Sequence, residues 1–210
     1  MTLLYSSRWT RKLVVGLQTL AFRATNRNAT FGPGLRIRGW PIARFVDGST
    51  AAFGRNLRLV SHSFFSAPGV NHPCILRTLT PHARITVGND VGMSGCTICA
   101  ADSVTIGDQC LLGANVLVAD TDFHPLAPEG RRYSRDGIAT APIEIGANVF
   151  IGANTMILKG VTVGANAVIG AGSVVTDDVP ADSIAVGVPA RVGGVTPVAH
   201  TADESTEADQ

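Results

Sequence analysis

The chain has few aromatic residues, no excess of charge of either sign and no short-period glycine pattern. Aromatic residues make up 6% of its 210 residues, and the formal net charge is +1. This balance gives no electrostatic argument for nucleic acid as a partner. The 23 glycines lack a collagen-like period, so they must serve turns. A hydrophobic content of 45% excludes a disordered chain.

Cysteine is also scarce, and its placement argues against both disulfides and zinc. The four cysteines are Cys74, Cys96, Cys99 and Cys110. They do not form the dense framework of a small secreted domain. The "CTIC" at Cys96–Cys99 has no second Cys pair or His pair at zinc spacing. We therefore expect buried free thiols and a reduced, intracellular protein.

No apolar run approaches the roughly 18 residues that would span a bilayer. The longest candidate, "LVVGLQTLAF" (Leu13–Phe22), has the length of a signal-peptide core. The following "RATNRNATF" offers no small-residue cleavage site. We therefore expect this segment to remain in the mature protein as a helix.

What the sequence does contain is a repeat of six residues. The aliphatic residues at steps of six, without a slip, are Ile145, Ile151, Ile157, Val163, Ile169 and Val175. The same unit begins upstream at Val87, Met93, Cys99, Ile106, Leu112 and Val118, with one extra residue in the unit that starts at Cys99. Imperfect units begin at Phe31 and Phe53.

A period of six fits neither an amphipathic helix nor a simple alternating strand. It suits short strands joined by tight corners and stacked as a solenoid, with one inward aliphatic residue per unit. We therefore predict an all-β solenoid domain over residues 29–192, regular from about residue 87. An external loop over residues 125–141 interrupts it.

The repeats, the ending "SVVTDDVPADSIAVGVPARV" (Ser173–Val192) and the motif "DFHPL" together resemble a known family. It is the hexapeptide-repeat acyltransferases, in the branch of maltose, galactoside and polysaccharide O-acetyltransferases. The resemblance is strong over residues 87–192 and weaker over 29–84. It implies a left-handed parallel β-helix, whereas general connection rules would favour the right hand.

The repeat breaks within "VLVADTDFHPLAPEGRRYSRDG" (Val116–Gly137), where charged residues gather. His124 falls six residues after Val118, so we expect it to occupy the next inward position. A histidine titrates near neutrality and can accept a proton from a hydroxyl. The resemblance implies that His124 is the general base. Asp120 and Asp122 are both candidates to orient its ring.

The resemblance and the residues themselves together suggest the remaining site residues. Acceptor contacts are expected from Asp102, Ser94, Asp122 and Asp136, although several relatives carry asparagine at the position of Ser94. The donor is expected to be acetyl-CoA, held by Gly152, Ala153, Ala171, Thr176, Arg191 and Lys159. Asp177 stands where relatives have a lysine, and a carboxylate cannot help to hold a phosphate. No metal is expected.

The predicted function is therefore transfer of an acetyl group from acetyl-CoA to a hydroxyl of a sugar or glycan-like acceptor, without an acyl-enzyme. The resemblance implies a homotrimer whose sites lie between subunits, and the free thiols lead us to expect a cytoplasmic location. Three alternatives remain: an amino-sugar N-acyltransferase, a non-catalytic scaffold, and a γ-carbonic-anhydrase-like metalloenzyme. The last would need three histidines to converge on one metal, and His62, His72 and His82 lie ten residues apart outside the regular repeats.

The two ends differ from the repeats. Residues 1–28 place Leu13, Leu17, Leu20 and Ala24 at helical spacing beside several cations. Such a helix either caps the β-helix or a neighbouring subunit, or rests on an anionic membrane. The polar, acidic segment Gly193–Gln210 is expected to be a disordered tail.

Overall fold

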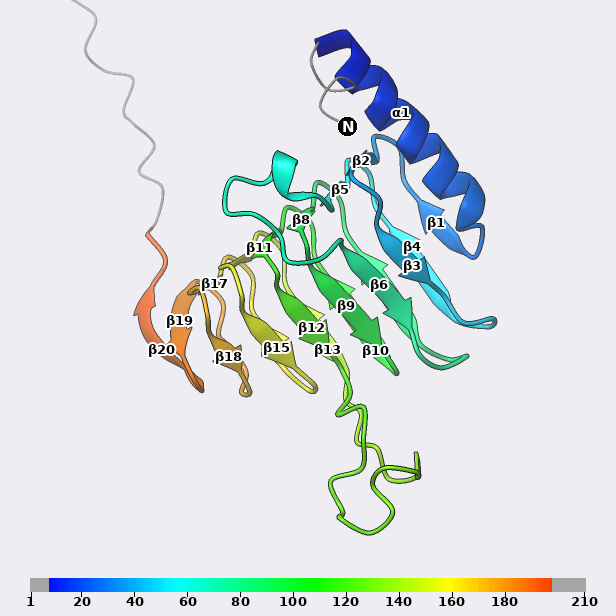
Figure 1. Cartoon of the computed structure of the whole chain (residues 1–210). Helices are drawn as coiled ribbons and strands as arrows, with labels where there is room; N and C mark the ends of the chain where they lie inside the picture. Colours follow the sequence, from blue (N-terminus) through cyan, green and yellow to red (C-terminus); the bar gives the residue numbers. More distant parts are fainter. Residues whose placement is uncertain (1–7, 198–210) are drawn as a thin grey trace, which may run out of the picture.

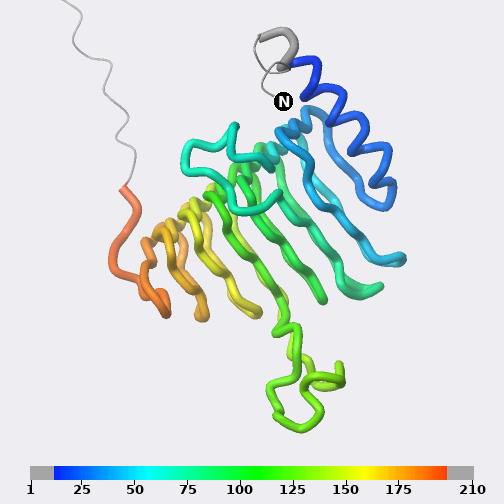
Figure 2. Tube along the Cα trace, in the orientation of Figure 1, coloured from blue at the N-terminus to red at the C-terminus, as the bar shows by residue number. Residues whose placement is uncertain are grey.

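The computed structural model of the chain describes residues 8–197. Within this range the chain winds through three sheets in turn, and each coil lies on the one before it (Figure 1). The trace in Figure 2 follows the same stack from the first coil to the last. The predicted all-β fold, a left-handed parallel β-helix of hexapeptide repeats with one N-terminal helix, is confirmed.

Three sheets form the sides of this prism, and we call them sheets A, B and C. Sheet A contains β1 (Ala29–Phe31), β4 (Thr50–Phe53), β7 (Arg84–Val87), β10 (Ser103–Ile106), β13 (Ile143–Ile145) and β16 (Thr162–Val163). Sheet B contains β2 (Arg36–Arg38), β5 (Arg58–Val60), β8 (Gly92–Ser94), β11 (Leu111–Ala114), β14 (Phe150–Ile151), β17 (Val168–Ile169), β19 (Ser183–Gly187) and β20 (Ala190–Val195). Sheet C contains β3 (Ile42–Arg44), β6 (Ile75–Thr78), β9 (Thr97–Ala100), β12 (Leu117–Ala119), β15 (Met156–Leu158) and β18 (Val174–Val175). Each coil turns at an A–B edge, a B–C edge and a C–A edge.

The six-residue period places one aliphatic side chain inside the prism on each side of each coil. All six residues of the regular run from Ile145 to Val175 are buried. The strands pair in register, for example Ile145 with Val163 on sheet A and Ile157 with Val175 on sheet C. Stacked aliphatic columns therefore form a core along the whole solenoid, and burial of their area is its main source of stability.

One register prediction is wrong. Cys99 does not take the inward position on sheet C, because Ile98 pairs with Val118 there and is fully buried. Between Met93 and Ile98 the coil has one residue fewer than a regular unit, and the wide corner that follows absorbs two more. The sequence shows only the sum of these two changes, which is the single extra residue.

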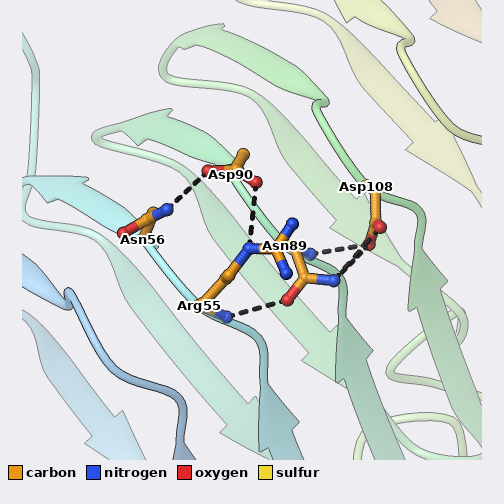
Figure 3. A network of polar contacts seen from close by, with 5 residues as sticks. All are labelled: Arg55, Asn56, Asn89, Asp90 and Asp108. Carbon is orange, nitrogen blue, oxygen red and sulfur yellow. Dashed lines mark hydrogen bonds and ion pairs between the residues drawn. The ribbon is translucent and has the colours of Figure 1, made fainter.

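The A–B edge is stabilised by hydrogen bonds between coils, as Figure 3 shows. Asn56 and Asp90 both have left-handed backbone conformations, with φ of 57° and 60°, which Asn and Asp tolerate better than most residues. The amide of Asn56 donates to Asp90 at 2.7 Å, and the Asn89 backbone N–H donates to Asp108 at 2.7 Å. This last bond lowers the pKa of the Asp108 carboxyl.

Two insertions leave the prism at its edges. Residues 61–74 extend from the B–C edge and contain a short 3₁₀ helix, Ser63–Phe65. The segment between β12 and β13 projects from the C–A edge as the long loop seen in Figures 1 and 2. The base of this loop is closed by a bridge between Thr121 and Thr140. The predicted loop, residues 125–141, lies within it.

Helix α1 (Arg8–Thr25) lies at the β1 end of the stack, and β20 lies at the opposite end (Figure 1). β20 pairs with β19 in an antiparallel ladder up to Val195. The predicted tail boundary at Gly193 is therefore wrong, because Gly193 and Gly194 belong to this strand. The remainder of the tail from residue 198, and residues 1–7 of the N-terminal segment, lie outside the described range.

Glycine at the B–C edge allows the coils to approach closely. A Cβ atom on Gly152 would lie 2.4 Å from the backbone nitrogen of Ala171, whereas one on Gly193 would meet no atom within 4 Å. Gly152→Ala should therefore destabilise the fold by roughly 1–3 kcal/mol through overpacking. Urea unfolding measures this, with Gly193→Ala as the matched control. Equal stabilities of the two variants would contradict the close-approach argument.

Candidate active site at the break of the repeat

The chain leaves the solenoid immediately after Asp120, whose side chain is completely buried. Its carboxylate accepts hydrogen bonds from the backbone N–H groups of Ala101 at 2.7 Å and Asp102 at 2.8 Å. Burial raises the pKa of the Asp120 carboxyl, and these N–H donors oppose the rise. Asp120 therefore joins the root of the loop to the wide corner of the preceding coil, and its bonds are not directed at His124.

Asp122 forms an ion pair with Lys159, whose Nζ atom lies 2.7 Å from Oδ1 of the carboxylate. Both side chains are partly buried, so this pair is less screened than one on the open surface. The second carboxylate oxygen, Oδ2, is buried and has no hydrogen-bond partner among the described residues. The sequence assigned Asp122 to the acceptor and Lys159 to the donor, and it did not predict that they bind each other.

His124 does not occupy an inward position, and this expectation is wrong. The aliphatic column on sheet A continues from Ile106 to Ile145, on the far side of the loop. Phe123 has a φ of 62°, and the chain turns there so that Pro125 is buried and His124 is exposed. No hydrogen bond or ion pair joins the His124 ring to another residue of the described range. The ring is accessible to a substrate.

The predicted site residues divide between two edges of sheet C. Those on or next to the C–A edge, from successive coils, are Asp102, Asp122, His124, Lys159 and Thr176. Those at the B–C edge are Ser94, Gly152, Ala153 and Ala171. Strands of three or four residues make sheet C roughly 10–13 Å wide. Within one chain, the width of sheet C therefore separates most of the predicted acceptor residues from the small residues that are expected to line the donor groove.

Two predicted residues have surroundings that the sequence did not indicate. Gly152 is buried, so close coil packing explains its glycine and it presents no surface to a ligand. Asp136 is exposed on the external loop, where its backbone N–H donates to Ser134 Oγ at 3.0 Å. Asp136 therefore lies outside the cluster at the C–A edge.

A second charged cluster lies near the end of the solenoid. Arg191 Nη1 is 2.9 Å from Asp177 Oδ2, and the Thr176 hydroxyl donates to the same oxygen at 3.0 Å. These side chains are largely exposed. Thr176 and Arg191, the two residues that the resemblance assigned to the donor, therefore share the carboxylate of Asp177, the position at which the resemblance predicted a lysine.

The histidines proposed for the metalloenzyme alternative have local roles or lie apart. His62 Nδ1 accepts from the Phe64 backbone N–H at 3.2 Å, and His72 Nδ1 lies 2.8 Å from the Pro73 carbonyl oxygen. Within residues 8–197 no group of three or more His, Cys, Asp or Glu side chains is placed to hold a metal ion. The geometry gives the metalloenzyme alternative no support.

All four cysteines are free and buried. Burial raises the pKa of each thiol, and for Cys99 the nearby Arg77 opposes the rise while Asp120 adds to it. The thiolate is the reactive form of cysteine. A buried thiol with a raised pKa is a poor nucleophile, so these residues do not offer a route through an acyl-enzyme.

Comparison with known protein families identifies the repeat. The bacterial transferase hexapeptide family, described as six repeats, matches residues 142–177. The hexapeptide repeat of succinyl-transferase matches residues 103–119. The two matches lie on either side of the loop that contains His124.

Individual proteins are also similar to this chain over part of their length, among them a galactoside O-acetyltransferase and a nodulation protein. Galactoside O-acetyltransferase of Escherichia coli K12 is 46% identical over 93 residues, which is 43% of this chain and 43% of that protein. Nodulation protein L of Rhizobium meliloti is 46% identical over 112 residues, 53% of this chain and 60% of that protein. The chain thus spans about half the length of the curated relatives it matches.

A solved structure extends the likeness over most of the chain. It is a mutant of AntD, an N-acyltransferase from Bacillus cereus, in complex with dTDP-4-amino-4,6-dideoxyglucose and coenzyme A. The TM-score is 0.65 at 19% identity, and the match covers 85% of this chain and 89% of that one. At this identity the likeness concerns the fold alone.

The raised pKa of Asp120 predicts a pH dependence of stability. The pKa of Asp120 in the folded protein lies above its unfolded value of about 3.9. The protonated side chain therefore stabilises the fold, and this contribution is complete only at pH values below the unfolded pKa. Its contribution is lost as the pH rises through the folded-state pKa. Urea unfolding across the acid range should show this loss for the wild type and not for Asp120→Asn. A difference between the two proteins that does not change with pH would contradict it.

Proposed function

We propose that this chain, a member of the hexapeptide-repeat acetyltransferase family, transfers an acetyl group from acetyl-CoA to a hydroxyl of a sugar or glycan-like acceptor. The observation that carries the proposal is the break in the repeat. There the exposed His124 follows closely on Asp122, which has one carboxylate oxygen without a partner in the described range. The names of the relatives support both the transferred group and a sugar hydroxyl as its acceptor.

The chemistry needs one base and two aligned substrates. A ring nitrogen of His124 takes the proton of the acceptor hydroxyl while the oxygen attacks the thioester carbonyl carbon. The carbon–sulfur bond then breaks, and the leaving thiolate of coenzyme A takes the proton back from the imidazolium. Direct transfer agrees with the inaccessible cysteines.

Asp122 is suited to orient one of the reacting groups. Lys159 occupies one oxygen of its carboxylate and fixes the side chain, while Oδ2 remains without a partner in the described range. In the proposal this oxygen accepts a hydrogen bond either from an acceptor hydroxyl or from the His124 ring. A desolvated oxygen of this kind costs free energy until a ligand or a side chain satisfies it.

Since the candidate residues lie along two edges of sheet C, the proposal includes a homotrimer in which neighbouring subunits complete each site. The outward faces of sheets B and C carry exposed apolar side chains, among them Leu111, Phe150, Ile42 and Met156. The exposed outward residues of sheet A include Thr86, Thr105, Glu144 and Thr162. This contrast favours contacts between subunits through sheets B and C.

The proposal also includes a cytoplasmic location, where acetyl-CoA is available and cysteines remain reduced. In residues 8–197 no helix is long and apolar enough to cross a membrane.

An acceptor panel tests the activity directly. The full chain is incubated with acetyl-CoA and with mono-, oligo- and nucleotide sugars that carry hydroxyl or amino groups, and free coenzyme A is measured. We expect release with at least one hydroxyl acceptor. Release only with amino sugars would support the N-acyltransferase instead, and no release with any acceptor would contradict both.

His124→Ala should lower kcat by roughly 10²- to 10⁴-fold, because the attacking hydroxyl loses its general base. The fold should be unaffected, since the ring is exposed and has no bond to another described residue. The matched control is His82→Ala, which removes an exposed histidine from the C–A edge two coils earlier. Turnover of the His124 variant close to that of the control would contradict the assignment.

Asp177→Asn should strengthen donor binding, because the variant releases Arg191 for the phosphates of acetyl-CoA. The ion pair between Asp177 and Arg191 is exposed and therefore weak. We thus expect the KM for acetyl-CoA to fall by at most about fivefold, with kcat unchanged. Arg191→Gln should raise this KM. Glu144→Gln, the same change of charge on sheet A, is the control. An increase in KM on Asp177→Asn would show that this carboxylate positions Arg191 instead of competing for it.

A further inference from the structure

Helix α1 is fixed to the β-helix by one side, and that side was not predicted. Phe22 is 1% exposed and lies against Phe31 and Trp40, with ring centroids 5.5 and 6.0 Å away. Arg23 donates to the carbonyl oxygens of Phe31 and Gly32. The helix therefore closes the open end of the hydrophobic core, as a cap would.

The leucines at helical spacing face away from this contact. Leu13, Leu17 and Leu20 are 64%, 59% and 67% exposed, and they follow one another at intervals of four and three residues. The sequence left both packing and membrane contact open for this apolar stripe, and within the described residues the stripe is an exposed surface. Three adjacent exposed leucines on one helix face are uncommon unless something binds them.

The surroundings of this leucine stripe are strongly basic. The sequence of α1, "RWTRKLVVGLQTLAFRAT", contains four cations and no acidic residue. Beside the helix lies a groove of about 610 Å³ between α1 and β2. Its lining combines Lys12, Arg23, Arg36 and Arg38 with Val15, Leu20 and Leu35, and includes no carboxylate.

We propose that α1 and this groove form a binding site for the surface of an anionic membrane. The leucine stripe lies in the acyl region just below the headgroups, and the exposed cations of the groove, Lys12 and Arg36, contact lipid phosphates. The positive flanks favour this occupant over a second copy, since a two-fold contact through the stripe would bring like charges together. The site does not depend on the acetyl transfer proposed above.

Flotation of the full chain with lipid vesicles tests the proposal. We expect the protein to float with vesicles that contain phosphatidylglycerol, and at least about tenfold more weakly with phosphatidylcholine alone. Binding should weaken as salt is added. An equal distribution in both vesicle types, or no flotation with either, would overturn the proposal.

Two variants separate the apolar from the charged part of the site. The combined change Leu13→Gln, Leu17→Gln and Leu20→Gln should reduce binding to anionic vesicles at least about tenfold. It should leave the circular dichroism, the melting temperature and the basal turnover of a soluble acceptor unchanged, because these side chains are exposed. Val195→Gln, at another exposed apolar position, is its control.

The combined change Lys12→Gln and Arg36→Gln should also weaken binding and reduce its dependence on salt. Arg84→Gln, an exposed cation on sheet A, is its control and should bind as the wild type does. The double variant and its control keep the proposal testable if the leucine variant fails to fold. Binding equal to that of the controls would overturn the site.

Light scattering on the leucine variant tests whether a second copy of the chain, instead of a membrane, binds the leucine stripe. We expect its mass in solution to equal that of the wild type. A fall to a smaller assembly would show that the stripe is covered by a second copy of the chain, and would overturn the membrane site.

Discussion

The fold depends on hydrogen bonding between successive coils, because every strand from β1 to β19 pairs with the strand of the same sheet one coil away. Backbone N–H and C=O groups are satisfied between coils, so each coil must repeat the path of its neighbour. That requirement allows one inward aliphatic residue per side and close corners such as that of Gly152 against Ala171. Extra residues can leave the prism only at its edges, as residues 61–74 and the His124 loop do.

This constraint also determines where chemistry is possible. Inward side chains fill the core, so functional side chains must come from the edges, from the outward faces and from the inserted loops. The root of the long loop is held by the buried Asp120 and by the Thr121–Thr140 bridge. A rigid C–A edge therefore carries the Asp122–Lys159 ion pair, and His124 is presented beside it at the start of the loop.

The sequence was sufficient for features that depend on the period. It predicted the repeat from Ile145 to Val175, the inserted loop and the helix. The prediction failed where local geometry alters the number of residues in a repeat unit. Ile98, for example, takes the inward position that was expected of Cys99. The inward placement of His124 failed because the aliphatic column resumes at Ile145, after the loop. The partners of Lys159 and Arg191 were missed because residues far apart in sequence meet only once the coils have stacked.

The chemical nature of the product tests the central claim most directly. The acceptor recovered after incubation with the full chain and acetyl-CoA is analysed by mass spectrometry before and after mild alkali. The account predicts a sugar that carries one added acetyl group as an ester, which alkali removes. An acetyl group that survives alkali as an amide, or no acetylated acceptor under any condition, would contradict transfer to a hydroxyl.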